Sequence, residues 1–249
     1  MGQKLAAYNT SGAITAFYDT VDSPAPAGVT TIDITDTQWQ TCLSNSGYTV
    51  VSGVLTPPSP PTPTQLAATA AQAQTAAMQT ACQNATNTPV SFKNAAGVTS
   101  TYAFGNTMTS GGANAQALLI QIIGAGSAAW TAGAWKDTNG IYQAMTFADL
   151  QGLAAAIEAM DTPDEQTLIA KEASIQAIQN LPARVASTAY TASQQIVDTN
   201  GNVWTASAGT TGTTCTFPTS PAIGATKTDG SVTWTFAGSQ VALIEGVTW

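Results

Sequence analysis

The sequence predicts a multi-domain α+β protein: a β-rich N-terminal unit with one short helix, an α+β middle with a long Ala-rich helix, and an all-β C-terminal module. Three observations carry this prediction. Helix-capping patterns alternate with hairpin turns up to residue 182. Residues 56–63 are rich in proline, and no pattern typical of a helix follows residue 183. The expected boundaries are therefore 1–55, a linker at 56–63, a middle domain at 64–182 and a module at 183–249.

The N-terminal unit begins with two predicted strands in residues 4–18, joined by the turn "NTSG", and a third strand in "TTIDI". Thr35 and Gln38 have the spacing of a capping box, so a short helix should follow. Another hairpin is expected around Ser52 and Gly53.

The segment "TPPSPPTP" should act as a stiff extended spacer, because closely spaced prolines fit neither sheet nor helix. An Ala-rich helix is predicted over 63–84, with Pro63 in its first turn. One stripe of this helix comprises Leu66, Ala70, Ala73, Ala77 and Ala81. A face of methyl groups buries little area, so the helix needs a partner. The sequence leaves two partners open: another helix of the same chain, or a second copy of it.

The middle domain should contain hairpins around Asn94–Gly97 and Asn139-Gly140, with a helix over 113–126 between them. Thr146 is predicted to cap a helix that carries Leu150, Leu153 and Ile157 on one face. The pattern "TPDE" at 162–165 predicts the start of a separate helix that runs to Asn180.

Composition excludes several classes of function. Only 8% of residues are charged, against about 25% in typical globular proteins. A net charge of −8 with six Lys and Arg argues against nucleic acid and anionic membranes as partners. No apolar run reaches the roughly 18 residues of a membrane span, and the N-terminus lacks the apolar core of a secretory signal. Membrane insertion is therefore not expected.

No catalytic, cofactor or metal site is expected either. The absence of histidine removes Ser-His and Cys-His couples and His-containing metal sites. Cys42, Cys82 and Cys215 are widely spaced and should be buried thiols, an intermolecular disulfide being the alternative. The carboxylates fit helix caps and turns, including the "DTNG" segments at 137–140 and 198–201, better than calcium loops or a glycosidase pair. An enzyme is not predicted.

The aromatic residues of the C-terminal module have two interpretations. Tyr190, Trp204, Trp234 and Trp249 could form its hydrophobic core, because a small β domain needs large side chains to bury enough area. Alternatively, they could form a platform on which a cell-surface sugar stacks.

Several segments resemble bacteriophage tail proteins. Ala189-Tyr190, Val203-Trp204, "GTTG" at 209–212, Pro221, Gly224 and "TDGSVTW" at 228–234 are similar to a small β module that recurs in those proteins. Ser193 stands where the module pattern usually has glycine, and "TTG" replaces "TSG". "ITDTQWQ" and "PPSPPTPTQLAATAAQAQ" resemble the start of tail fibre and tail-fibre-assembly proteins. "VSFKNAAGVTSTYAFG" and "MTFADLQGLAAAI" resemble an uncharacterised domain often found behind that start.

This resemblance implies a structural component of a phage virion, a tail fibre or tail-attached appendage, made in the host cytoplasm and incorporated in the tail. It implies other tail or baseplate proteins as partners, a homo-oligomer with a trimer favoured, and a bacterial surface glycan as a candidate ligand. The alternative is a tail-fibre assembly chaperone that is absent from the mature particle. A sugar-degrading enzyme is a more distant alternative.

Overall fold

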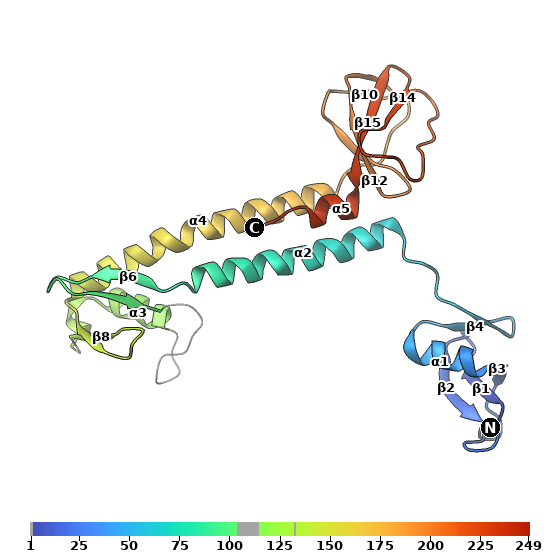
Figure 1. Cartoon of the computed structure of the whole chain (residues 1–249), viewed down its shortest axis with the longest axis horizontal. Coiled ribbons are helices and arrows are strands. Elements are labelled where there is room, and N and C mark those ends of the chain that lie inside the picture. The colour runs from blue at the N-terminus through green and yellow to red at the C-terminus, as the bar shows by residue number, and fades with distance from the viewer. Residues whose placement is uncertain (1, 104–114, 132) are drawn as a thin grey trace. The chain divides into compact units, whose positions relative to one another are not determined.

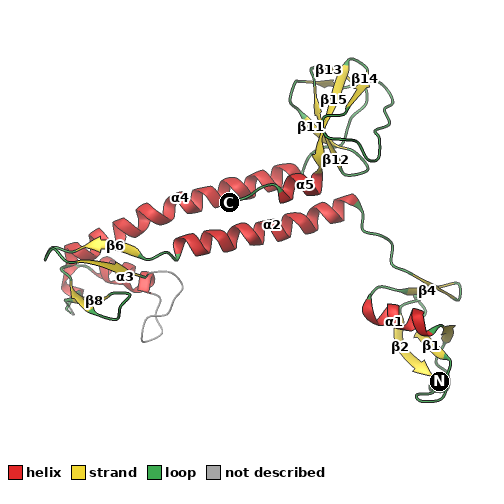
Figure 2. Ribbon diagram, in the orientation of Figure 1, coloured by secondary structure: helices red, strands yellow, loops and turns green. Residues whose placement is uncertain are grey.

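The computed structural model describes residues 2–103, 115–131 and 133–249 and divides the chain into two compact units, Met1–Thr62 and Pro63–Trp249. Helices account for 36% of the residues and strands for 26%, which confirms the predicted α+β class. Figure 1 shows the elements in chain order, and Figure 2 shows where helix and strand alternate.

The first unit contains a three-stranded antiparallel sheet in the order β2-β1-β3, formed by β1 (Lys4–Tyr8), β2 (Ile14–Asp19) and β3 (Thr31–Ile34). Helix α1 (Asp36–Ser44) follows, and the hairpin of β4 (Thr49–Val51) and β5 (Val54–Thr56) completes the unit. The capping box predicted at Thr35 and Gln38 is confirmed, since each side chain bonds the other residue's backbone N–H.

Helix α2 (Pro63–Thr86) opens the second unit at the predicted residue. It packs beside α4 (Phe147–Gln179), and α5 (Gln240–Glu245) packs against both helices. One apolar cluster joins the three helices. Its buried members are Ala67, Ala70, Ala71, Met78, Ile175 and Ile244.

The prediction of two helices between 146 and 180 is wrong. The structure has one helix, α4, that continues through Pro163. Thr146 caps it and forms the predicted capping box with Asp149. A proline in a helix interior removes one hydrogen bond, but both halves of α4 are anchored in hydrophobic clusters, and these hold the helix together on either side.

The middle part of the second unit surrounds the N-terminal half of α4. It comprises the hairpin β6 (Val90–Lys93) and β7 (Thr99–Tyr102), helix α3 (Ala115–Ala125), the 3-10 turn η1 (Ser127–Ala129), and the hairpin β8 (Ala134–Lys136) and β9 (Tyr142–Ala144). Residues 113 and 114, the predicted start of the helix over 113–126, lie outside the described residues. The core contains Val90, Tyr102, Ala115, Leu119, Trp135, Met145, Leu150, Leu153 and Ile157.

The C-terminal module is a four-stranded antiparallel sheet, in the order β11-β12-β15-β14, with a short additional pair. The sheet strands are β11 (Gln195–Val197), β12 (Asn202–Ala206), β14 (Thr226–Asp229) and β15 (Val232–Ser239). The additional pair is β10 (Ala189–Tyr190) with β13 (Gly209–Thr210). Residues Gln240–Glu245 form helix α5, although the sequence shows no helix signal after residue 183.

One type of turn recurs in hairpins of both units. It begins at Asn9, Asn94, Asp137 and Asp198, and in each case the Asx side-chain oxygen accepts the backbone N–H four residues later. A glycine three residues after the Asx has a positive φ and donates its N–H to the Asx carbonyl. Each "DTNG" segment therefore uses its single carboxylate to close a turn.

Candidate interaction surfaces

The predicted stripe on α2 is only partly available for contact with a second chain. Leu66 is 46% exposed, and Ala73 and Ala77 are also exposed. Ala70 is buried and Ala81 is half-buried. Assigning Ala70 to an intermolecular interface is therefore wrong, because it already packs inside its own chain.

The buried face of α2 is rotated away from the predicted stripe. Ala67, Ala70, Ala71 and Met78 form the cluster with Ile175 of α4 and Ile244 of α5. Leu168, Ile178, Val241 and Val247 pack around it. The partner helices of α2 thus come from the same chain, which was one of the two possibilities left open by the sequence.

Hydrogen bonds attach the C-terminal segment to the helix pair. The Gln240 side chain donates from Nε2 to the carbonyl oxygens of Ile178 at 2.7 Å and Gln179 at 3.0 Å. These are terminal carbonyls of α4, which lack partners within the helix. The Gln74 side chain donates to the carbonyl of Val247. The segment that ends the chain therefore holds α2 and α4 together.

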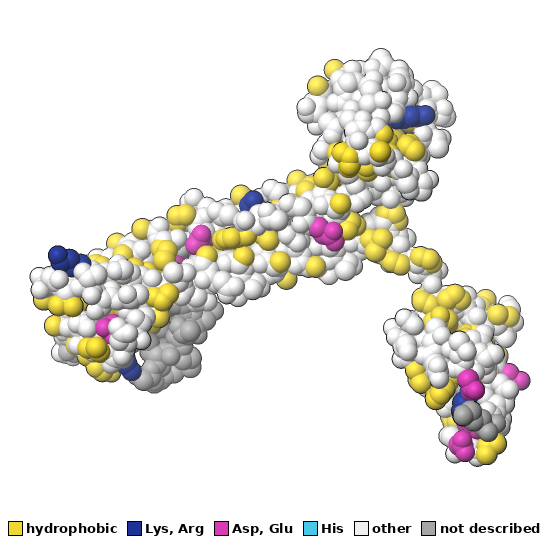
Figure 3. Space-filling model, viewed as in Figure 1, with side chains coloured by type: hydrophobic (Ala, Val, Ile, Leu, Met, Phe, Trp, Pro, Cys, Tyr) yellow, Lys and Arg dark blue, Asp and Glu magenta, His cyan; other side chains and the backbone are white. Residues whose placement is uncertain are grey.

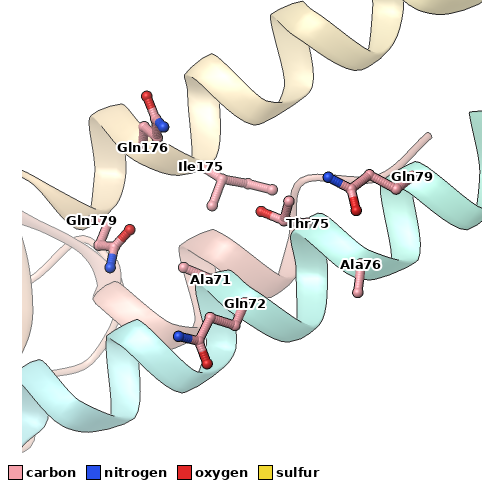
Figure 4. Close-up of a pocket in the computed structure, with 8 residues that line it drawn as sticks. All are labelled: Ala71, Gln72, Thr75, Ala76, Gln79, Ile175, Gln176 and Gln179. Atoms are coloured by element: carbon pink, nitrogen blue, oxygen red, sulfur yellow. The ribbon is translucent and has the colours of Figure 1, made fainter.

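An open groove of about 280 Å³ runs between α2 and α4, as Figure 4 shows. Four glutamines, one threonine and three apolar residues line it. The lining residues are Ala71, Gln72, Thr75, Ala76, Gln79, Ile175, Gln176 and Gln179. Gln79 donates to Glu172 of α4 at 2.9 Å. None of these lining residues is charged.

The aromatic cluster of the C-terminal module is a hydrophobic core. Trp204 and Trp234 are fully buried. The ring centroids of Trp204 and Phe236 are 5.4 Å apart, and those of Tyr190 and Trp234 are 5.0 Å apart. Placing Trp204 and Trp234 on a sugar-binding platform is therefore wrong, because neither ring reaches the surface.

The indole N–H groups of the two buried tryptophans also have hydrogen-bond partners. Trp204 donates from Nε1 to Asp198 at 2.9 Å, and Trp234 donates to Asp229 at 3.2 Å. Tyr190 is half-buried, and its hydroxyl accepts the backbone N–H of Val185. Trp249 is 41% exposed, so among the four proposed aromatic residues it offers the most accessible ring. It lies outside the module, beyond α5.

The motif residues of the module meet at Asp229. Its carboxylate accepts bonds from the Arg184 guanidinium, the Gly212 N–H and the Trp234 indole. The Arg184 guanidinium, followed by the Trp234 and Gly212 donors, lowers the pKa of this carboxyl group. Gly230 beside it has a φ of 66°, and a Cβ there would lie 2.3 Å from the carbonyl oxygen of Thr210. These residues therefore build the module and do not present a ligand surface.

The structure places the remaining polar candidates in structural roles. Cys42 and Cys82 are buried, Cys215 is half-buried, and burial raises the pKa of each thiol. Within residues 2–103, 115–131 and 133–249, no His, Cys, Asp and Glu side chains gather in a group that could hold a metal ion. In the same ranges no helix combines the length and the apolar character needed to cross a bilayer.

Charged groups are sparse on the surface. Figure 3 shows isolated cationic and anionic side chains on each unit, separated by neutral polar and apolar areas. Among the described residues, two cations form ion pairs, Lys4 with Asp19 and Arg184 with Asp229, and both acids are buried. Such a surface offers few charges for electrostatic attraction of a partner.

A comparison with protein-family models, curated proteins and solved structures finds no match for this chain.

Proposed function

We propose that this protein is a structural component of a bacteriophage particle, either a tail fibre or another tail-attached appendage. The proposal rests on the resemblance of its segments to phage tail proteins. One structural observation supports that resemblance in particular. Ser193, which stands where the module pattern has glycine, has a φ of 71°, in the region where glycine is favoured.

The other residues that carry the resemblance also have structural roles that suit them. A Cβ at Gly209 would lie 2.6 Å from the carbonyl oxygen of Ser231. The "DG" and "W" of the closing motif supply Asp229, Gly230 and the buried Trp234. A module built in this way from glycines, hydroxyl side chains and one buried ion pair suits repeated display on a particle, because it needs little surface charge.

Self-association belongs to the same proposal. Leu66, Ala73 and Ala77 form an exposed apolar stripe on α2, and small side chains permit close approach between helices. We propose that copies of the chain associate through this stripe, with a trimer as the favoured state. Other tail or baseplate proteins are the proposed neighbours in the particle.

The composition of purified virions tests the proposal. Mass spectrometry of particles from a phage that encodes this chain should detect the protein in constant ratio to a known tail protein. A matched lysate fraction without particles serves as the control. Presence in the lysate together with absence from washed virions would instead identify an assembly chaperone and would overturn the structural assignment.

Glycan binding remains a secondary part of the proposal. Because Trp204 and Trp234 are buried, a sugar-binding surface would have to use other groups, such as the ring of Trp249. Binding of the purified protein to host-surface polysaccharide tests this part. Release of reducing ends from the polysaccharide would favour a sugar-degrading enzyme.

A further inference from the structure

The middle of α4 lies between two hydrophobic cores. Upstream, Leu150, Leu153 and Ile157 belong to the core of the α+β part. Downstream, Leu168 and Ile175 pack against α2 and α5. The intervening segment 161–167, "DTPDEQT", has no aliphatic or aromatic side chain apart from the proline ring. This stretch of helix therefore contributes no side chain to either hydrophobic core.

That backbone is weakened at the same place. Pro163 lies inside α4 and has no N–H, so the carbonyl four residues earlier loses its helical partner. Proline also has the lowest helix propensity of all residues. The continuity of α4 through this turn depends on the two cores that anchor its halves.

A half-buried carboxylate, Asp161, lies in the same turn. Asp161 faces a cleft of about 370 Å³ between α3 and α4, lined by Gln116, Leu119, Ile120, Ala154, Ile157, Glu158, Asp161, Thr162 and Glu165. The Oδ1 atom of Asp161 is buried and has no hydrogen-bond partner. Its Oδ2 atom accepts a long bond of 3.4 Å from Gln116. Burial of an ionised oxygen without a partner is unfavourable.

The charged groups around Asp161 are all acidic. On α4, Glu158, Asp164 and Glu165 stand three or four residues away, which is the spacing of neighbouring side chains on a helix. Helix α3 has no ionisable side chain, and α2 contributes the thiol of Cys82. Within the described residues, neither ion pair lies in this region. The nearest cation along α4 is Lys171.

We propose that residues 158–167 form a pH-sensitive hinge in α4, which stiffens when Asp161 is protonated and loosens when Asp161 is ionised. Protonation removes one of the clustered negative charges and the cost of burying an ionised Oδ1 atom. The hinge would let the α+β part move relative to the α2–α5 end of the helix pair. This inference does not depend on the proposed function.

The sign of the effect follows from the environment of the group. Burial, with help from Glu165 and Asp164, raises the pKa of Asp161 above its ordinary value of 3.8. The folded state then binds the proton more tightly than the unfolded state, so this group's contribution to stability declines as pH rises from 3.8 through the native pKa. Because the chain has no histidine, no imidazole titration overlaps with that of this carboxyl group.

Amide hydrogen exchange of the full chain tests the hinge. Protection factors, corrected for the intrinsic effect of pH, are compared at about pH 4.5 and pH 7. We expect the amides of 159–167 to be several-fold less protected at pH 7 than at pH 4.5. The flanking amides of 150–157 and 168–176 should change little. Equal protection of all three segments at pH 7 would overturn the proposal.

Substitutions assign the effect to Asp161. Asp161→Asn keeps the shape of the side chain and should hold residues 159–167 in the protected state at both pH values. Asp164→Asn removes the same charge from the same helix but outside the cleft lining, and should keep the pH response. Pro163→Ala should raise protection at both pH values. A pH response that persists undiminished in Asp161→Asn would show that another group controls the segment.

Discussion

Arg184 and Asp229 form a bidentate ion pair inside the C-terminal module. The Nε–Oδ2 distance is 2.5 Å and the Nη2–Oδ1 distance is 2.9 Å. The Asp229 side chain is fully buried, and the same Nη2 also donates to the carbonyl of Gly212. Arg184 precedes β10 in the sequence, whereas Asp229 ends β14. The ion pair therefore attaches the segment that leads into the module to strand β14 of its sheet.

Breaking this pair from one side should strongly destabilise the module. Asp229→Asn leaves the guanidinium without its carboxylate, and the loss of one partner of a buried pair typically costs about 3–5 kcal/mol. Urea unfolding followed by tryptophan fluorescence measures the change, since Trp204 and Trp234 are buried in the module. Lys227→Met, which removes a cation from the same strand outside the ion pair, should have little effect. A loss below about 0.5 kcal/mol, the range of ordinary surface substitutions, would contradict the structural role of the pair.

Acid should destabilise the C-terminal module through the same carboxyl group. The pKa of Asp229 is lowered below the ordinary value of 3.8. Its contribution to stability is therefore present above pH 3.8 and is lost as pH falls through the native pKa. We expect the fluorescence midpoint in urea to decrease between about pH 4 and pH 2. In Asp229→Asn the decrease should be smaller, and an unchanged decrease would assign the acid sensitivity to other carboxyl groups.

The sequence predicted the helices and turns more reliably than the tertiary contacts between them. Capping boxes and Asx-Gly turns are local signals, so the helix starts at Thr35 and Thr146 and the hairpin turns agree with the structure. The start of a separate helix at Pro163 was wrong because proline favours the first turn of a helix, and its place inside α4 depends on tertiary anchors. The elements against which those anchors pack, among them α2, α3 and α5, lie far from Pro163 along the chain.

The buried face of α2 could not be chosen from alanines alone. Alanines occur on several sides of this helix, so a stripe through Ala73 and Ala77 is about as plausible as one through Ala67 and Ala71. Met78 and Cys82 mark the face that is buried in the structure. The tryptophans were ambiguous for a related reason, because large rings suit a core and a sugar platform equally well. The burial of Trp204 and Trp234 in the structure assigns both rings to the core, and this burial cannot be read from the sequence.

Replacing Ser193 with glycine should stabilise the module. Ser193 has a φ of 71°, where a side chain costs about 1–2 kcal/mol, while glycine loses about 0.5–1 kcal/mol of backbone entropy. The N–H of residue 193 would keep its bond to the carbonyl of Ala206. We expect a gain of roughly 0.5–1 kcal/mol in urea unfolding. Ser220→Gly, at an exposed position without a positive φ, should give no gain. Destabilisation by Ser193→Gly would mean that the serine side chain has another role.

Two tryptophan substitutions should distinguish the contribution of the module core to stability from that of the C-terminal residues. Trp204→Ala removes a fully buried side chain and should destabilise the module by about 3–5 kcal/mol. Trp249→Ala removes a partly exposed side chain and should leave the melting temperature of the module almost unchanged. Calorimetry of both variants checks these expectations. Comparable losses in the two variants would show that the end of the chain contributes to stability as much as the core does.

The last prediction concerns self-association through the exposed stripe of Leu66, Ala73 and Ala77. Glutamates at 73 and 77 should dissociate the proposed oligomer, because copies that meet along this stripe would bring like charges together in a desolvated contact. The intramolecular cluster should survive, since Ala73 and Ala77 are exposed and do not belong to it. Light scattering at micromolar concentration should report an oligomer for the native chain and a monomer for the Ala73→Glu and Ala77→Glu double variant.

A matched double variant controls for the added charge. Gln72→Glu with Gln83→Glu introduces the same two negative charges at exposed positions on another side of α2. The oligomer of this variant should therefore have the same mass as that of the native chain. Circular dichroism should give the same helix content for all three proteins, because none of the changes touches the buried face. A native chain that is already monomeric at this concentration would exclude the stripe as an interface. In that case the contacts of α2 with α4 and α5 would be sufficient to hold the helix in place.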